Sequence, residues 1–383
     1  MGSTRLTGVN VEPPPEHVLV AFGLAGAQPI LLGAGWEGGW RCGEVVLSMV
    51  ADNARAAWSA RVRETLFVDG VRLARPVRST DGRYVVSGWR ADTFVAGAPE
   101  PRHDEVVSAA VRLHEATGKL ERPRFLTQGP AAPWAEIDVF VAADRAGWEE
   151  RPLQSVPPGV PTAPPAADPQ RSIDLINQLA GLRKPTKSPN QLVHGDLYGT
   201  VLFAGTAPPG ITDITPYWRP ASWAAGVAVV DALSWGAADD GLIERWNALP
   251  EWPQMLLRAL MFRLAVYALH PRSTAEAFPG LAHTAALVRL ELLTYSARRK
   301  LIADLAQRHP AVNTENALCA QQLQLPGGQV LCWAPGGSDH PVPGQIRGIG
   351  PHNPADNTRT GKPCESCDVA VGGHPAEWDG RDQ

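Results

Sequence analysis

The sequence predicts an α+β protein of two lobes, a small, mostly antiparallel β-rich lobe followed by a larger helical lobe. In the first hundred residues, short apolar and β-branched runs are separated by Gly, Asp and Asn. From Asp104 onward, apolar residues recur with helical spacing. The early order of three strands, a helix and a strand is not a βαβ alternation, so a doubly wound parallel sheet is not expected. With 383 residues and 44% hydrophobic composition, the chain is long and apolar enough for two cores.

The β-rich lobe is predicted to cover residues 1–98. Its expected helix spans Asp52–Leu66, with Asp52 or Asn53 as the N-cap, because both residue types accept hydrogen bonds from first-turn amides. Its expected strands are Val18–Phe22, Ile30–Leu32, Val45–Val50 and Tyr84–Val86.

The helical lobe is predicted to cover residues 99–308. Its first helix follows Asp104 and ends near Gly118, a plausible C-cap. A proline-rich loop over Arg151–Pro169 separates it from further helices. These span Ile173–Leu182, Val227–Trp235, Met255–Leu269 and Ala282–Ala306, the third of them apolar nearly all round and therefore buried. Residues 309–383 are rich in Pro and Gly and are predicted to be a disordered tail.

Charge and composition exclude several classes of function. With 35 basic and 39 acidic side chains and a net charge of −4, an electrostatic nucleic-acid or membrane-surface binder is not expected. No apolar run is long enough to span a membrane, and no secretory signal is visible. Cys364 and Cys367 lack a second close pair, which favours free thiols over a zinc site. Five cysteines make no disulfide framework, so a cytoplasmic location is expected.

A glycine-rich motif lies between two predicted strands. Gly33, Gly35 and Gly38 match G-x-G-x-x-G, a pattern that a simple tight turn also explains. A dinucleotide-binding motif would continue into a helix, but Trp40–Val50 is predicted to be extended. Glycines between antiparallel strands let backbone amides approach a triphosphate, as in a kinase-type loop.

The strongest chemical signal is His194-Gly195-Asp196-Leu197, followed 17 residues later by Asp213. A hairpin of Val201–Phe203 and Ile211–Ile214, closed by Pro208-Pro209-Gly210, is expected between the two aspartates. Phosphoryl transfer needs one carboxylate to accept a hydroxyl proton and another to hold Mg²⁺. The alternative is that His194 and Asp196 bind only the loop backbone and that Asp213 caps a turn.

With these motifs, residues 15–295 resemble the aminoglycoside phosphotransferase and choline kinase-like family, and in particular an uncharacterised actinobacterial branch of it. The resemblance implies a two-lobed protein-kinase-like fold with ATP and Mg²⁺ in the cleft. Asp196 would be the catalytic base, His194 of the same loop would be a second catalytic residue, and Asp213 would hold Mg²⁺. Gly33, Gly35 and Gly38 would line the phosphate loop. Ser87–Ala91, including Trp89, would be the hinge that meets adenine, and Asp231 would brace the catalytic loop.

Two departures from the family pattern leave the activity open. The strand lysine that pairs the ATP phosphates is replaced by Ser48, and Arg41 is the nearest cation along the sequence. Glu64 is a possible ionic partner, although a solvated helix face also explains it. The metal-binding asparagine is replaced by Thr200, whose hydroxyl is able to ligate Mg²⁺.

Two hypotheses follow. In the first, the chain is an ATP- and Mg²⁺-dependent phosphotransferase that acts on a hydroxyl of a small molecule of unknown identity. In the second, it is a catalytically impaired, pseudokinase-like protein that binds nucleotide or a partner protein. The segment Tyr217–Pro220 either shapes an acceptor pocket or packs in the interior. Asp239, Asp240 and Glu244 either attract a cationic acceptor or form a solvated helix terminus.

Overall fold

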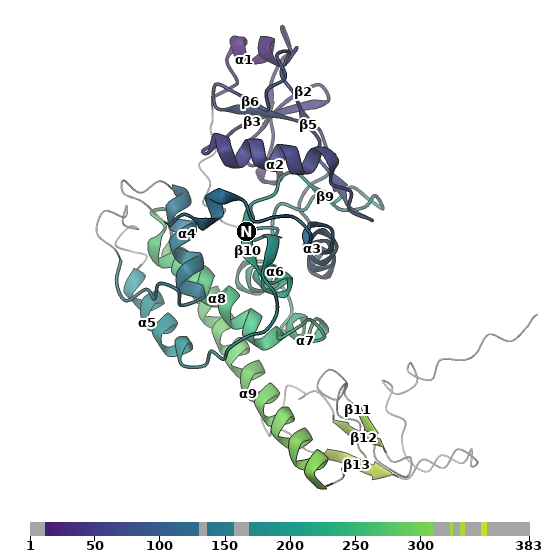
Figure 1. The fold of residues 1–383 in the computed structure, drawn as a ribbon, viewed down its shortest axis with the longest axis vertical. Coiled ribbons are helices and arrows are strands. Elements are labelled where there is room, and N and C mark those ends of the chain that lie inside the picture. Colours follow the sequence, from purple (N-terminus) through teal and green to yellow (C-terminus); the bar gives the residue numbers. More distant parts are fainter. Residues whose placement is uncertain are drawn as a thin grey trace, which may run out of the picture. The chain divides into compact units, whose positions relative to one another are not determined.

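The computed structural model describes residues 12–129, 136–156, 168–308, 322–324, 330–333 and 346–350. The chain divides into two compact units, Met1–Ala297 and Arg298–Gln383. The first unit carries the predicted β-rich and helical lobes (Figure 1).

The β-rich lobe is an antiparallel sheet in the order β1-β2-β3-β7-β5, with β6 also paired to β7. The strands are β1 (Ile30–Leu31), β2 (Trp40–Cys42), β3 (Val45–Met49), β5 (Pro76–Val77), β6 (Val85–Val86) and β7 (Trp89–Thr93). Residues 18–22, predicted as a strand, lie largely in helix α1 (Glu16–Ala21) instead. A short apolar run does not distinguish a strand from a buried helical turn, and Pro15 precedes the first turn here.

Helix α2 (Asn53–Thr65) packs on the sheet face that looks toward the helical lobe (Figure 1). Asp52 is its N-cap, as predicted, because its side chain accepts hydrogen bonds from the amides of Ala54 (2.8 Å) and Arg55 (3.1 Å). The opposite sheet face is apolar: Leu47 and Trp89 pack there with Val18 of α1. The sheet thus has one apolar face and one face that is available for polar groups.

The helical lobe is built around α8 (Trp252–Leu269), whose residues are nearly all buried, as the sequence predicts. α8 packs against α4 (Glu136–Gly147), α5 (Pro169–Ala180) and α6 (Ala221–Trp235), while α6 also contacts α3 (His103–Thr117). The short α7 (Leu242–Arg245) follows α6, and α9 (Phe278–Arg308) ends the lobe. An antiparallel sheet crossed by one helix, followed by a helical lobe, confirms the predicted α+β fold of two lobes.

Short strands hold the loop region between the lobes. β8 (Gln191–His194) pairs antiparallel with β10 (Pro216–Arg219). β9 (Gly210–Ile211) pairs with Leu202 and, in parallel, with β4 (Arg72–Leu73) of the β-rich lobe. The predicted hairpin is therefore present, and its far strand is also bound to the first lobe.

The second unit contains three described strands, β11 (Gln322–Gln324), β12 (Val330–Trp333) and β13 (Ile346–Gly350), which form an antiparallel sheet. No strand was predicted there. The rest of the predicted tail, with Cys364 and Cys367, lies outside the described residues. Within the described part of the chain, no helix is both long and apolar enough to cross a membrane.

Candidate functional site

The H-G-D loop follows β8 directly and places Asp196 beside a buried arginine. Nη2 of Arg263, on α8, donates a hydrogen bond to Oδ1 of Asp196 (2.9 Å), and its Nε donates to Asp231 of α6 (2.7 Å). The side chain of Asp196 is 26% exposed, whereas those of Arg263 and Asp231 are 6% and 3% exposed. Asp231 therefore braces the loop through Arg263, and the Asp196 carboxylate stays accessible.

His194 and Gly195 shape the loop. His194 is buried; its amide donates to Nε2 of His114 (3.1 Å), and its Nδ1 accepts from the amide of Asp196 (3.2 Å). A Cβ on Gly195 would lie 2.4 Å from the ring of Tyr217, so this close approach requires glycine. The described contacts of His194 position Asp196.

Thr200 lies one turn after Asp196 and is buried. Its hydroxyl lies within hydrogen-bonding distance of the carbonyls of Leu197 (2.8 Å) and Asp196 (3.2 Å), to which it donates. The threonine thus stabilises the turn that carries Asp196, and these contacts direct its hydroxyl into the loop backbone.

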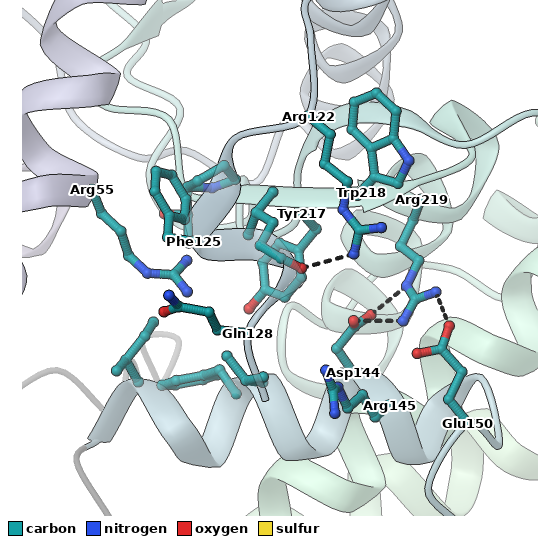
Figure 2. Close-up of a pocket in the computed structure, with 16 residues that line it drawn as sticks. Arg55, Arg122, Phe125, Gln128, Asp144, Arg145, Glu150, Tyr217, Trp218 and Arg219 are labelled. Atoms are coloured by element: carbon teal, nitrogen blue, oxygen red, sulfur yellow. Dashed lines mark hydrogen bonds and ion pairs between the residues drawn. The ribbon is translucent and has the colours of Figure 1, made fainter. Parts of the chain in front are cut away.

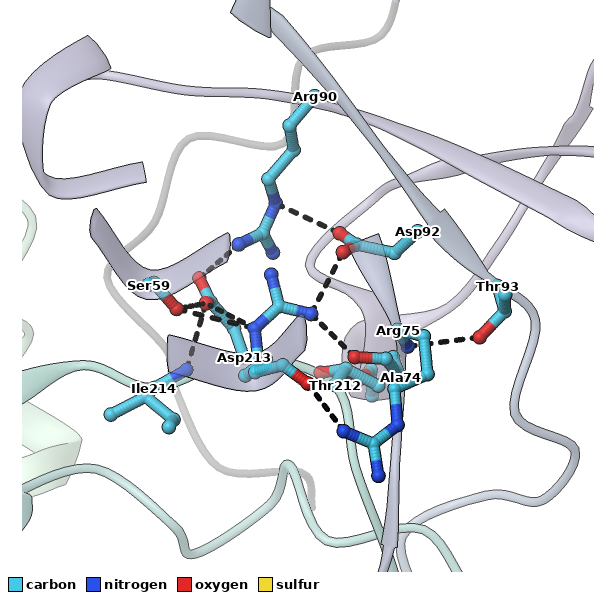
Figure 3. Close-up of polar contacts among 11 residues, drawn as sticks. Ser59, Ala74, Arg75, Arg90, Asp92, Thr93, Thr212, Asp213 and Ile214 are labelled. Atoms are coloured by element: carbon cyan, nitrogen blue, oxygen red, sulfur yellow. Dashed lines mark hydrogen bonds and ion pairs between the residues drawn. The ribbon is translucent and has the colours of Figure 1, made fainter. Parts of the chain in front are cut away.

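Asp213 lies in a cluster of charged groups beneath the sheet (Figure 3). Its Oδ1 accepts from Ser59 Oγ (2.6 Å) and from the amide of Ile214 (2.7 Å), and lies 3.5 Å from Nε of Arg63. Its Oδ2 forms an ion pair with Nη1 of Arg90. Burial alone would raise the pKa of Asp213, but the two guanidinium groups and the hydrogen bonds hold it well below its usual range.

Asp92 completes the cluster with a second carboxylate. Oδ1 of Asp92 lies 2.7 Å from Nη1 of Arg63, and its Oδ2 lies 3.3 Å from Nε of Arg90. The side chains of Arg63 and Asp92 are 0% and 1% exposed. Two guanidinium groups and two carboxylates therefore compensate one another in the interior, as buried charges require.

Arg90 is the functional candidate that the sequence analysis missed. It lies directly opposite Ser48 across the β3–β7 ladder, so both side chains emerge on the same sheet face. A cation therefore lies across the ladder from the position where the family resemblance implies a lysine, and it pairs with Asp213 and Asp92. Strand register was the only signal for it, and register was not assigned from the sequence. Arg90 lies 42 residues from Ser48, too far along the chain to be noticed by proximity.

The charged side chain that α2 directs toward the sheet is basic, whereas the sequence analysis considered the acidic Glu64 for this role. Arg63, not an acidic residue, points from α2 to the sheet and binds Asp92. Glu64, the ionic partner considered from the sequence, faces outward and accepts hydrogen bonds from Arg78 Nε (2.9 Å) and the Tyr84 hydroxyl (2.7 Å). The bond from Arg78 is the main reason that the pKa of Glu64 is lowered.

The residues around Asp213 do not fit the Mg²⁺ that the family resemblance implies. A Mg²⁺ site offers several oxygen ligands in octahedral geometry, commonly one or two carboxylates. Here both Asp213 oxygens bind cationic or hydrogen-bond donor groups, and the Thr200 hydroxyl donates to the loop backbone. Among the described residues, no group of three or more His, Cys, Asp or Glu side chains could hold a metal ion.

The glycine loop connects β1 and β2 and reaches the neighbourhood of Asp213. A Cβ on Gly35 would lie 2.3 Å from Leu202, and the Gly35 carbonyl lies 3.5 Å from Oγ1 of Thr212, the residue before Asp213. Gly38 has φ +77°, a conformation that favours glycine, while Gly33 has open space around it. The structure thus brings the loop close to Asp213.

Arg41 and the predicted hinge are not among the groups gathered there. Arg41 Nε donates to the Gly43 carbonyl (2.7 Å), its Nη2 pairs with Glu44 (3.0 Å), and its guanidinium covers the Phe94 ring. Ser87 lies in the β6–β7 turn, and the side chain of Trp89 is buried in the apolar sheet face. The chain passes between the lobes at residues 94–102, so the hinge predicted at Ser87–Ala91 is misplaced by one strand.

Comparison with known proteins gives similarity of structure only. No protein-family model and no curated protein sequence matches the chain. An AMP-bound spectinomycin phosphotransferase, APH(9)-Ia, is 12% identical, with 71% of this chain and 96% of that chain covered and a TM-score of 0.44. A choline kinase from Cryptosporidium parvum Iowa II is 9% identical, with 70% of this chain and 89% of that chain covered and a TM-score of 0.42. A putative fructosamine-3-kinase from Haemophilus somnus 129PT is 13% identical, with 73% of this chain and 96% of that chain covered and a TM-score of 0.40. These values leave the function to be argued from the side chains.

Proposed function

We propose that the chain is a phosphotransferase that moves a phosphoryl group from a nucleoside triphosphate, ATP by the family resemblance, to a hydroxyl group of a small molecule. The acceptor oxygen would bond to the γ-phosphorus while the bond between that phosphorus and the β-phosphate oxygen breaks. The hydroxyl proton would pass to the Asp196 carboxylate, and the nucleoside diphosphate would leave.

The observation that supports this proposal best is the setting of Asp196. Arg263 holds one carboxylate oxygen at 2.9 Å, and the side chain remains 26% exposed on the loop after β8. A catalytic base needs both a fixed orientation and access to the acceptor.

The test is the Asp196→Asn variant, assayed for transfer from labelled ATP to a panel of hydroxyl compounds. Loss of the base should lower kcat about 10²–10⁴-fold, while nucleotide affinity stays near that of wild type because Asp196 is not expected to bind the nucleotide. Asp174→Asn, on the exposed face of α5, is the matched control and should retain activity. Equal transfer by wild type and Asp196→Asn would contradict the assigned role.

A second candidate function is a pseudokinase-like protein that binds nucleotide or a partner protein without turnover. The contacts of Asp213 favour it, because an aspartate held by Arg63, Arg90 and Ser59 does not fit Mg²⁺. Calorimetric titration of ATP with and without Mg²⁺ separates the two. Equal affinity in both titrations, with no transfer to any acceptor, would support the second candidate, whereas measurable transfer would support the first.

A further inference from the structure

A pocket open to solvent lies against β10, the strand that pairs with β8 (Figure 2). α2 contributes Arg55, η2 (Arg124–Thr127) and its flanks contribute Arg122 and Phe125, and α4 contributes Arg145. β10 forms another wall, which includes Trp218. The Tyr217–Pro220 segment, for which both a pocket and a packing role were considered, does both, because Tyr217 and Arg219 are buried and also line the pocket.

The charge of this pocket is positive. Four arginines and two carboxylates line it. Both carboxylates are already taken by one arginine, since Arg219 lies 2.7 Å from Asp144 and 2.6 Å from Glu150. The lining therefore carries two more positive than negative charges, and Arg55, Arg122 and Arg145 form no ion pair with either of these carboxylates.

Arg122 and Arg145 are the most available of the three. Nη2 of Arg122 donates to the Leu126 carbonyl (2.7 Å), and neither side chain forms an ion pair with any residue that the structure describes in this region. Arg55 pairs with Asp52 (3.3 Å) and lies over the Phe125 ring. Guanidinium groups match carboxylate and phosphate oxygens in two-point contacts.

The remaining walls are apolar and aromatic, including Phe125, Phe140 and Trp218. A pocket of this type holds a ligand by apolar contact and orients it through a few charged groups. Its position links it to the chemistry, because the carbonyl of Thr215, a lining residue, accepts a hydrogen bond from the amide of Gly195 (3.1 Å). A molecule in the pocket would therefore lie beside the loop that carries Asp196.

We propose that this pocket binds a small organic anion, one with a carboxylate or phosphate group and an apolar body, through Arg122 and Arg145. Its role as the acceptor pocket rests on the proposed function, but anion binding itself does not. The acidic residues considered for a cationic acceptor do not line the pocket: Asp239 pairs with Arg245 (2.7 Å) and Asp240 with His283 (3.1 Å). The inferred charge of the acceptor is thus negative.

The test uses the full chain and two probes of similar shape and opposite charge, phenyl phosphate and phenyltrimethylammonium, in calorimetric titrations. Phenyl phosphate should bind, and Arg122→Gln and Arg145→Gln should each weaken it about tenfold, the loss expected for one charge-assisted hydrogen bond. Arg61→Gln, an equal charge change on the exposed face of α2, should leave the affinity within about twofold because distant surface charges are screened. Benzoate in place of phenyl phosphate distinguishes a carboxylate ligand from a phosphate ligand.

Three results would overturn the proposal: no binding of either anion, tighter binding of phenyltrimethylammonium, or anion binding that Arg122→Gln and Arg145→Gln leave unchanged. The last result would place the anion elsewhere, for example among the nucleotide contacts. Asp196→Asn separates this proposal from the proposed function, since it should abolish transfer and retain anion binding. Arginine-dependent anion binding without transfer to any hydroxy acid would support the pocket and contradict the enzyme. If the protein transfers phosphate to a neutral acceptor and Arg145→Gln does not change the rate of that transfer, the result would support the enzyme and contradict the role of the pocket.

Discussion

Replacing Asp213 by Asn tests whether this residue is a structural ion-pair partner or a metal ligand. Asparagine keeps the shape and is able to accept a hydrogen bond from Ser59, but it removes the charge that faces Arg90 and Arg63. These arginine side chains are 8% and 0% exposed. Removing one partner of a buried pair destabilises a protein by about 3–5 kcal/mol. Because Asp213 is 26% exposed, we expect the lower end, about 3 kcal/mol.

The assay is urea unfolding in metal-free buffer, with Asp81→Asn as the control because Asp81 forms an exposed ion pair with Arg83. The control should leave the free energy of unfolding nearly unchanged. The pKa of Asp213 is lowered in the folded state, so its contribution is present above the unfolded pKa of about 3.9 and is lost as the pH falls below it. The difference between wild type and Asp213→Asn should therefore shrink in acid.

Unchanged stability of Asp213→Asn in metal-free buffer would refute the structural role. If Mg²⁺ also raised the Tm of wild type but not that of the variant, Asp213 would be a metal ligand after all. If Asp213 is an ion-pair partner only, Mg²⁺ should change the free energy of unfolding of neither protein, and the difference between wild type and Asp213→Asn should be the same with and without Mg²⁺.

Three further variants test other parts of the site. Ser48→Lys should lower the free energy of unfolding by about 1–3 kcal/mol in urea titrations, because it adds a cation opposite Arg90 and a larger side chain next to Gly39. Equal stability together with a gain in phosphoryl transfer would contradict this. Gly195→Ala should lower kcat and stability, since its Cβ would meet the buried Tyr217 ring, whereas Gly181→Ala, with open space, should be nearly neutral in both assays. Burial lowers the pKa of His114 to about 3, so wild-type stability should fall as the pH drops from about 6.5 toward 3, by up to about 1.4 kcal/mol per pH unit, and His114→Gln should flatten that slope in pH-dependent unfolding.

Local signals in the sequence predicted much of the fold. The Asp52 cap, the buried helix α8 and the hairpin closed by Pro208-Pro209-Gly210 each depend on neighbouring residues, and each is present. The α1 helix was missed because a single apolar turn has no measurable period. The hinge was placed one strand too early because β7 (Trp89–Thr93), which overlaps the predicted hinge, was not recognised as a strand.

The non-local part of the site could not be predicted in the same way. The Arg90–Asp213 ion pair joins residues far apart in the sequence, and the pairing of β7 with β3 sets the sheet face on which Arg90 meets Asp213. The Arg263–Asp196 contact likewise depends on how α8 packs under the loop after β8. Asp196 itself was found because its H-G-D motif is contiguous, whereas its arginine anchor has no local pattern.

The backbone ladder between β4 and β9 bears on how the protein can move. The amides of Arg72 and Ala74 donate to the carbonyls of Pro209 (2.8 Å) and Ile211 (3.0 Å), and Ala98 and Phe203 exchange two more bonds beside the hinge. A movement that separates the β-rich lobe from the helical lobe would have to break these hydrogen bonds together. We therefore expect the two lobes to resist separation. Amide exchange at Arg72, Ala74 and Phe203 should therefore be slow and correlated.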